Sequence, residues 1–314
     1  MRAEELFHMF PQVMRGRWEQ VAGLADRLQE IRLRVNVPAA VWIDNREWFV
    51  DAEGMLTDRQ PGSGAYRAEE LEMVLKHLCQ YSIYAFTDEI RQGFLTIQGG
   101  HRIGLSGQVI LEEQDRIRNL KYIRYLNIRI AHEIKGVADK VLPYLYDSRG
   151  QALNTLLISP PGCGKTTMLR DIIRHLSNGT KYGKGMNVSV VDERSEIAGS
   201  YLGTAQNDVG IRTDVLDGCP KQEGMMLLIR AMSPQVLAVD ELGSEGDIRA
   251  LQMASGCGCR LIATIHGSSL AEVRNKKYMC DVIEGRLFER YLVLTRRSGR
   301  CEVEGIYDRE GMRC

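Results

Sequence analysis

The second half of the chain alternates short apolar runs with segments whose apolar residues recur every three to four positions. Short runs of this kind predict buried strands, and the wider spacing predicts helices that cover a sheet. We expect strands at 153–159, 187–191, 236–240 and 260–265, with helices between them. Strands that alternate with helices favour an α/β fold, with a mostly parallel sheet that is covered on both faces.

The first half shows both periods without this regular alternation, which is typical of a smaller α+β domain. Polar and apolar residues alternate at 30–35, which predicts a half-buried strand. A glycine-punctuated stretch at 93–111 predicts a hairpin or a tight loop, and Ile128 and Ile130 flank Arg129 as in a strand. The other expected elements are strands at 41–43 and 48–50 and helices at 20–29, 67–79, 82–92 (with Ser82 as its cap) and 136–146.

This change of pattern divides the chain into two expected domains. Residues 1–146 form an N-terminal α+β domain, the polar residues 147–151 form a linker, and residues 152–314 form the second domain. A length of 314 residues fits two domains. The C-terminal tail is expected to be an antiparallel pair of strands, 291–295 and 302–307, around the turn Ser298-Gly299.

The run from Ser159 to Thr167 follows the first strand of the second domain and opens a helical pattern, as a phosphate-binding loop does. Glycines let consecutive backbone N–H groups surround a phosphate, and the start of a helix attracts the same negative charge. Lys165 is expected to reach the β- and γ-phosphates of ATP, and the Thr166 hydroxyl to ligate Mg²⁺. The usual pattern begins with glycine, where this chain has Ser159. The residues expected to bind the nucleotide are Pro161, Gly162, Cys163, Gly164, Lys165, Thr166 and Thr167.

Two carboxylates, Asp240 and Glu241, follow the apolar strand at 236–240. The carboxyl end of such a strand lies at the edge where open α/β sheets bind ligands. Adjacent carboxylates are costly there unless a cation lies near, which indicates a metal. We expect Asp240 to hold Mg²⁺ through water and Glu241 to polarise the attacking water. With the phosphate loop, this pair predicts a RecA-like P-loop NTPase domain.

The neighbouring strands also end in polar residues. Glu193 and Glu196 follow the strand at 187–191, and either is an alternative to Glu241 for positioning the water. An acidic residue that favours a helix start explains Glu196 equally well. His266 ends the strand at 260–265, where it is expected to contact the γ-phosphate and to report hydrolysis to a subunit interface.

Arginines are further candidates, because an arginine from a neighbouring subunit stabilises the charge that builds on the phosphoryl group in ring ATPases. The sequence does not choose among four of them: Arg102, Arg129, Arg212 and Arg230. A polar, glycine-containing segment at 213–220 is expected to be a loop that faces the ring pore or a neighbour.

Composition and charge argue against several other classes of protein. Basic and acidic side chains number 41 each, so no overall charge draws the chain to nucleic acid or to an anionic membrane. No apolar run is long enough to span a bilayer, and the N-terminus is too acidic for a signal peptide. The eight cysteines lack the spacing of a zinc site, which favours free thiols in a reducing cytosol.

Taken together, these motifs resemble the stage III sporulation protein AA family, which is related to the ATPases of type II and type IV secretion. The resemblance spans nearly the whole chain, and its most specific strings are 192–196 and 213–220. In secretion ATPases, an acidic box and a histidine box correspond in position to 192–196 and His266. The segments that carry the resemblance are 30–34, 100–107, 159–171, 191–196 and 213–220.

The resemblance implies a hexameric, cytoplasmic ATPase in the mother cell of an endospore-forming bacterium, with ATP and Mg²⁺ as its cofactors. Such a protein would power or assemble the channel between mother cell and forespore, and membrane components of that channel would recruit it. The resemblance also implies an N-terminal domain that packs on the neighbouring ATPase domain and supplies arginines in trans, for which Arg102 and Arg129 are our candidates.

Two other functions remain open. A nucleic-acid translocating ATPase is supported only by the arginine-rich run at 116–129, and no direct contact with nucleic acid is expected from the neutral charge. A nucleotide-gated scaffold would bind ATP without turnover, and the pair Asp240 and Glu241 argues against it.

Overall fold

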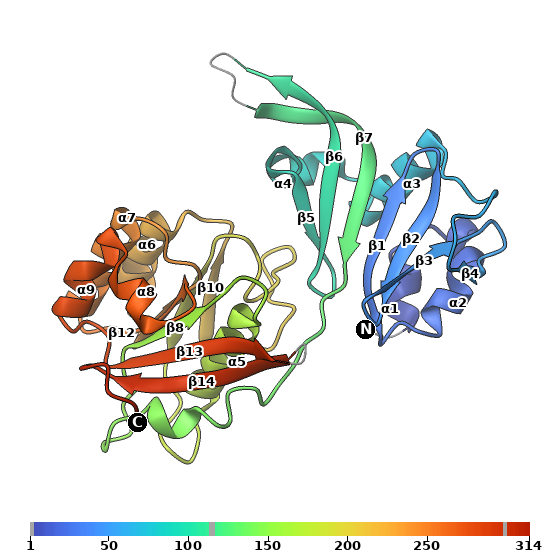
Figure 1. Ribbon diagram of the computed structural model, residues 1–314. Coiled ribbons are helices and arrows are strands. Elements are labelled where there is room, and N and C mark those ends of the chain that lie inside the picture. The colour runs from blue at the N-terminus through green and yellow to red at the C-terminus, as the bar shows by residue number, and fades with distance from the viewer. Residues whose placement is uncertain (1–2, 113–116, 298–299) are drawn as a thin grey trace. The chain divides into compact units, whose positions relative to one another are not determined.

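The computed structural model describes residues 3–112, 117–297 and 300–314. The chain divides into two compact units, Met1–His132 and Glu133–Cys314 (Figure 1). We call them the N-terminal unit and the C-terminal unit. The sequence predicts a linker at 147–151, whereas the structure divides the chain between His132 and Glu133.

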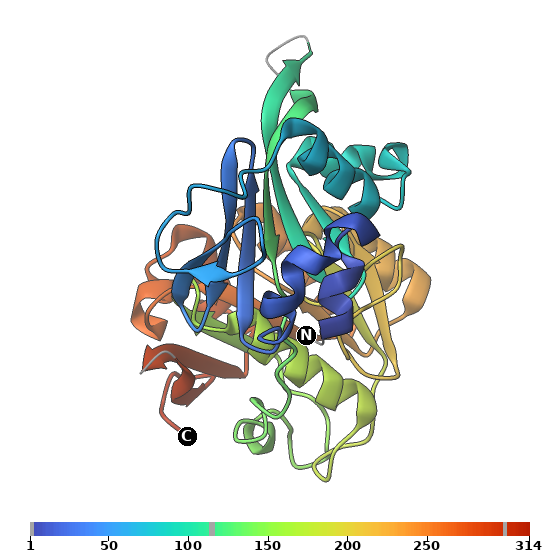
Figure 2. The same ribbon diagram turned by 90° about the vertical axis from the view of Figure 1, so that its right-hand side faces the viewer.

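A seven-stranded antiparallel sheet organises the N-terminal unit, in the order β4-β3-β2-β1-β7-β6-β5. In Figure 2 the dark-blue helices of this unit lie in front of its strands. The strands are β1 (Leu28–Arg34), β2 (Val37–Ile43), β3 (Arg46–Val50), β4 (Leu56–Thr57), β5 (Phe94–Ile97), β6 (His101–Leu111) and β7 (Ile117–Arg129). The helices are α1 (Ala3–His8), η1 (Gln12–Trp18), α2 (Glu19–Ala22), α3 (Ala68–Leu78), η2 (Ile83–Phe86) and α4 (Thr87–Gln92).

Local sequence explains the strands of this sheet. The alternation in β1 buries Ile31 and Leu33 on one face of the sheet, and Leu28 is buried before a register shift between Leu28 and Glu30. Between β2 and β3, Asp44 and Asn45 both have positive φ, 51° and 62°, as a two-residue hairpin turn requires. The expected hairpin at 93–111 is confirmed, since β5 and β6 pair antiparallel.

The C-terminal unit holds a second seven-stranded sheet, in the order β10-β9-β11-β12-β8-β13-β14. Neighbouring strands are parallel, except that β14 pairs antiparallel with β13. The mostly parallel sheet and the antiparallel C-terminal pair are thus confirmed. The strands are β8 (Thr155–Ser159), β9 (Val188–Asp192), β10 (Thr213–Asp217), β11 (Val236–Val239), β12 (Arg260–His266), β13 (Arg290–Arg297) and β14 (Arg300–Asp308). The helices are η4 (Leu142–Tyr144), α5 (Lys165–Asn178), α6 (Lys221–Met232), α7 (Glu245–Gly256), α8 (Leu270–Arg274), η5 (Lys277–Met279) and α9 (Cys280–Glu284).

Two apolar clusters cover the two faces of this sheet. In β11, Leu237 and Val239 belong to one cluster, whereas Val236 and Ala238 belong to the other. Helices α6, α7 and α9 pack in the first cluster, and α5 packs in the second. The sheet is therefore buried on both faces, which explains why its central strands are continuous apolar runs in the sequence.

The expected helix at 136–146 is wrong, because only the short η4 forms there. Pro143 lies inside the pattern and lacks the N–H that a helix needs. The apolar residues of this segment pack instead in the same cluster as α5, so the segment belongs to the C-terminal unit. The expected linker likewise folds back as a turn within this unit, where the Asp147 N–H donates to the Gln151 carbonyl at 2.9 Å.

Three smaller predictions also need correction. The expected loop at 213–220 begins with a strand, because β10 pairs parallel with β9. The expected helix at 20–29 ends early, because α2 stops at Ala22 and β1 begins at Leu28. Ser82 makes no side-chain cap, and the helix expected after it divides into η2 and α4.

Two further findings concern the cysteines and the length of the helices. All eight cysteines are free thiols. Among the residues that the structure describes, no helix is both long enough and apolar enough to cross a membrane. Arg116 of the arginine-rich run and the turn residues Ser298 and Gly299 lie outside the described residues.

Candidate nucleotide-binding site

The segment between β8 and α5 has the backbone of a phosphate-binding loop. Gly162 and Gly164 have φ of 71° and 82°, a left-handed conformation that glycine adopts without cost. Gly164 is the N-cap of the 14-residue helix α5. A Cβ on Gly162 would meet no atom within 4 Å, so this part of the loop is open to a ligand. Ser159, at the position where glycine is usual, is fully buried, and its carbonyl accepts from the Gly267 N–H at 3.1 Å.

The Lys165 side chain is 5% exposed, and its ammonium faces two partners across the sheet edge. Its Nζ lies 3.3 Å from Glu241 Oε1 and 3.4 Å from each ring nitrogen of His266. A buried ammonium is costly unless it is paired. The phosphate-loop lysine, the second residue of the carboxylate pair and the expected histidine therefore lie together, as the strand-end argument predicts.

A second group of oxygens forms beside this one. Thr166 Oγ1 donates to Asp240 Oδ2 at 2.8 Å, and Thr264 Oγ1 donates to the other oxygen, Asp240 Oδ1. Thr264 Oγ1 also accepts from the backbone N–H of Glu241 at 2.8 Å. One buried hydroxyl on β12 thus fixes both residues that follow β11. A hydroxyl and a carboxylate are hard oxygen donors of the kind that Mg²⁺ selects, so these residues suit the metal that the sequence implies.

Glu241 is the centre of the charged cluster. Its backbone is left-handed, with φ of 55°, and its side chain is 27% exposed. His266 Nε2 lies 2.8 Å from Oε1, and Arg194 Nη1 lies 3.3 Å from Oε2. Burial acts to raise the pKa of Glu241, but the Lys165 ammonium and His266 outweigh it, so the pKa is lowered and the carboxylate stays ionised.

The acidic box at 192–196 is held by its first residue. The Asp192 carboxylate is 2% exposed and accepts from the backbone N–H groups of Glu196, Ile197 and Ala198 at 2.8, 3.0 and 2.8 Å. Burial raises the pKa of Asp192 even though these donors oppose the rise. Asp192 therefore shapes the loop and is not itself directed at the Lys165 cluster.

The two glutamates of this box occupy different places. Glu193 Oε2 binds Lys221 Nζ, and both residues line a cavity of about 540 Å³ together with Glu241 and His266. Glu196 is outside this lining, and its backbone carbonyl accepts from Arg170 Nη2 at 2.7 Å. Among the three carboxylates considered for positioning the water, Glu241 contacts both Lys165 and His266.

Of the four candidate arginines, Arg212 and Arg230 belong to the C-terminal unit, and neither is among the described contacts of Lys165, Asp240 and Glu241. Arg212 Nη1 donates to the Ser177 carbonyl at 2.9 Å, and Arg230 lies on the exposed side of α6. Arg102 and Arg129 are in the N-terminal unit, where they face each other across β6 and β7. The Arg102 guanidinium covers the ring of Phe94, with 4.1 Å from Cζ to the ring centroid.

Two residues that contact the site, Arg194 and Thr264, were not assigned a role from the sequence. Arg194 was visible within the acidic string, but that string did not show which way its side chain points. Thr264 was visible in the strand that ends at His266, as a lone polar residue in an apolar run. A hydroxyl in a fully buried strand needs a partner, and that signal would have directed attention to Asp240.

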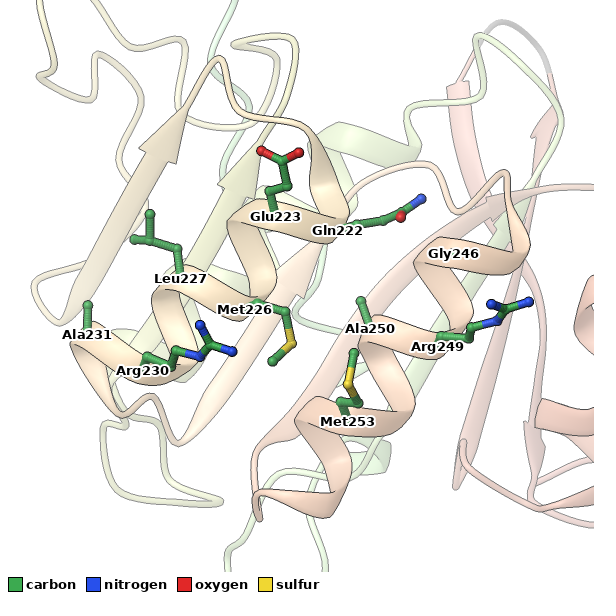
Figure 3. A pocket seen from close by; sticks show the side chains of 10 residues that line it. All are labelled: Gln222, Glu223, Met226, Leu227, Arg230, Ala231, Gly246, Arg249, Ala250 and Met253. Atoms are coloured by element: carbon green, nitrogen blue, oxygen red, sulfur yellow. The ribbon is translucent and has the colours of Figure 1, made fainter.

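A separate groove of about 810 Å³ lies between α6 and α7. Figure 3 shows Arg230 and Leu227 on α6 and Arg249 and Met253 on α7 along its sides. Leu227 and Met253 are 51% and 49% exposed. The lining of the groove includes none of the residues that contact Lys165 or Asp240.

Comparison with known proteins agrees with these motifs. The family model for sporulation stage III, protein AA, matches residues 1–314, the whole chain. The chain belongs to this family. A stage III sporulation protein AA from Bacillus subtilis (strain 168) is 40% identical over 284 residues, which are 90% of this chain and 88% of the relative. The family resemblance that the sequence motifs carry is confirmed.

Two solved structures share the fold of this sporulation stage III AA family member. The Legionella pneumophila ATPase DotB matches with a TM-score of 0.58 and 16% identity, over 95% of this chain and 81% of DotB. The pilus retraction motor PilT matches with a TM-score of 0.59 and 14% identity, over 92% of this chain and 81% of PilT. The expected α/β fold with a RecA-like P-loop domain is thereby confirmed.

Proposed function

We propose that this chain is a Mg²⁺-dependent ATPase whose hydrolysis site is the cluster of Lys165, Glu241 and His266 beside the pair Thr166 and Asp240. The observation that carries the proposal is the buried Lys165 ammonium, which faces a carboxylate and an imidazole at the end of an open glycine loop. The fold shared with the ATPase DotB and with PilT, whose structure holds ADP, supports it.

Each residue has a role that follows from its chemistry. The loop residues 161–167 would bind the phosphates, with Lys165 exchanging Glu241 for a phosphate oxygen. Thr166 and Asp240 would hold Mg²⁺, which when bound neutralises charge on the phosphates. Glu241, which stays ionised, would orient the attacking water, and His266 would hold the Glu241 carboxylate and contact the terminal phosphate. Glu193 and Glu196 remain alternatives for the water-positioning role.

The wider function follows from family membership. We propose that the chain works in the mother-cell cytoplasm during endospore formation, where it powers or assembles the channel to the forespore and is recruited by membrane components of that channel. A ring of copies, expected to be a hexamer, would place Arg102 and Arg129 of one copy against the nucleotide of another. Arg102 and Arg129 are cross-strand partners, so their side chains leave the same face of the sheet, and two cations on one face suit a polyphosphate.

The test is nucleotide binding and phosphate release by the full chain and two variants. For Lys165→Ala we expect nucleotide affinity to fall by about 10- to 100-fold, since a charge-assisted hydrogen bond to phosphate is lost. For Glu241→Gln we expect nearly unchanged affinity and a fall of about 10²- to 10⁴-fold in turnover, because the general base is removed. The exposed Lys140→Ala and Glu245→Gln serve as matched controls and should behave as the wild type.

The size of the particle is measured on the same samples, with and without a non-hydrolysable ATP analogue. Wild-type turnover in both variants contradicts the proposed site. A monomer under both conditions, at full turnover, contradicts the ring. Tight binding without turnover by the wild-type assembly would favour a nucleotide-gated scaffold, and stimulation by DNA or RNA would favour a nucleic-acid motor.

A further inference from the structure

Glu241 has cationic or hydrogen-bonding groups on both of its carboxylate oxygens. Lys165 and His266 contact Oε1, and Arg194 contacts Oε2. With both oxygens engaged in this way, the carboxylate is poorly placed to accept a proton from water. At least one of these contacts has to open before Glu241 acts as a base. The contact that opens most readily therefore controls when Glu241 can act.

Arg194 is the most exposed of the three groups. Its side chain is 60% exposed, against 42% for His266 and 5% for Lys165. An exposed ion pair changes an equilibrium by only about 1- to 5-fold, so solvent competes with it effectively. Arginine on a phosphate gains two parallel charge-assisted bonds, which is a stronger contact than the single one to Glu241. Exchange of the carboxylate for a phosphate is therefore favourable for Arg194.

The backbone around Arg194 is fixed, so only its side chain needs to move. Glu193 before it binds Lys221, and Ser195 after it donates to Asp217 Oδ1 at 2.8 Å. Ser195 has φ of 52°, a conformation held by the surrounding contacts. The Asp192 carboxylate ties down the next backbone N–H groups. The loop thus presents one movable guanidinium beside the cluster.

We propose that Arg194 is a sensor of the terminal phosphate supplied by the same chain, an inference that rests on the proposed nucleotide site. When the terminal phosphate is present, Arg194 leaves Glu241 Oε2 for a phosphate oxygen, and the freed oxygen accepts a hydrogen bond from the attacking water. When only a diphosphate is bound, Arg194 returns to Glu241. Charge stabilisation by an arginine then does not depend entirely on a neighbouring copy.

The experiment compares the affinity for ADP with that for a non-hydrolysable ATP analogue, together with turnover, in the full chain. For Arg194→Gln we expect ADP affinity within about 2-fold of the wild type, analogue affinity weaker by about 10-fold, and kcat lower by about 10²-fold. Arg194→Lys should restore part of the analogue affinity but little of the kcat, since an ammonium lacks the planar fork. Arg249→Gln, at an arginine that is 75% exposed on α7, is the matched control.

The outcomes separate this inference from the proposed function. If Arg194→Gln leaves the ratio of the ADP affinity to the analogue affinity unchanged, the sensor role is overturned, even if the wild type hydrolyses ATP. A wild-type chain that prefers the analogue and loses this preference in Arg194→Gln, yet shows no turnover, supports the sensor and contradicts hydrolysis. The melting temperature of each variant shows whether a loss of binding comes from unfolding. If Arg194→Gln has the same melting temperature as the wild type, the change in affinity comes from the lost Arg194 contact.

Discussion

A single hydroxyl connects the two adjacent acidic residues of the candidate site, Asp240 and Glu241. Thr264 is fully buried in β12, donates to Asp240 and accepts from the backbone N–H of Glu241. Because Glu241 has a left-handed backbone, this hydrogen bond holds the direction in which its side chain leaves the sheet. Thr264 is therefore a positioning residue, since it acts on the site through Asp240 and Glu241.

Replacing Thr264 by Val keeps the shape of the side chain and removes both hydrogen bonds. We expect a loss of about 1–3 kcal/mol of stability, because the Glu241 N–H is left unpaired, and a fall of about 10²-fold in kcat, because both carboxylates lose their position. Urea unfolding and phosphate release measure the two effects. Thr264→Ser keeps the hydroxyl and should lose only about 1 kcal/mol and little turnover. Equal turnover of the Val and Ser variants would contradict this role.

At the scale of elements, one buried carboxylate fixes the segment that enters the C-terminal unit. Asp171 on α5 is 1% exposed in its side chain, and its Oδ2 accepts from the Ala138 N–H at 2.8 Å. Its Oδ1 binds the Arg174 guanidinium at 2.7 Å. Burial acts to raise the pKa of Asp171, but Ala138 and Arg174 outweigh it, so the pKa lies below its ordinary value.

Asp171→Asn should lower the free energy of unfolding by about 1–3 kcal/mol at neutral pH, because it removes a charged acceptor from a buried pair. A depressed carboxyl pKa contributes stability above the unfolded value, near pH 4, and loses it as the pH falls through the folded pKa. The difference in unfolding free energy between the wild type and Asp171→Asn should therefore become smaller below about pH 4. Urea unfolding followed by far-UV ellipticity measures this difference, with Asp281→Asn, at an exposed aspartate of α9, as the control. A difference that stays constant with pH would refute the ionic contribution.

The same elements show which parts of the fold follow from sequence. The strands β8, β9, β11 and β12 are predictable because both of their faces are buried, so their sequences are mostly apolar. Strand β10 lies at the edge of the sheet and is only partly buried, so its polar residues have the pattern of a loop. Apolar residues at 138–145 have helical spacing, but Pro143 and the contact to Asp171 favour another path.

The candidate site divides in a similar way. Lys165, Asp240, Glu241 and His266 were predictable as neighbours, because parallel strands end at one edge and that edge is fixed by topology. The place of Arg194 was not predictable, since it depends on the rotamer of a loop side chain. Which of Glu193, Glu196 and Glu241 faces Lys165 also depends on loop geometry, and the spacing of residues in the sequence does not contain it.

At the scale of the whole molecule, the tryptophans distinguish the two units. All three tryptophans, Trp18, Trp42 and Trp48, lie in the N-terminal unit. Tryptophan fluorescence therefore reports on the N-terminal unit, whereas nucleotide binding reports on the proposed site in the C-terminal unit. Tryptophan fluorescence is therefore the signal with which to follow a titratable group of the N-terminal unit.

His101 is such a group in the N-terminal unit. It is 2% exposed, its Nδ1 accepts from the Ala131 N–H at 3.0 Å, and burial lowers its pKa to about 4. The unfolded chain takes up a proton near pH 6.5, and the folded unit does so only near pH 4. Protonation therefore favours the unfolded state across this window, and stability falls as the pH decreases from about 6.5 to about 4.

We expect His101 to account for a loss of about 3 kcal/mol in the unfolding free energy of the N-terminal unit between these two pH values. Urea unfolding followed by tryptophan fluorescence measures this loss. The quantity compared between wild type and variant is the slope of the unfolding free energy against pH, not the free energy itself. In His101→Gln, which keeps an acceptor for the Ala131 N–H and has no titrating group, the slope should become shallower by that amount. An identical slope in the variant would show that the imidazole is protonated in the folded unit, against the burial that the structure gives it.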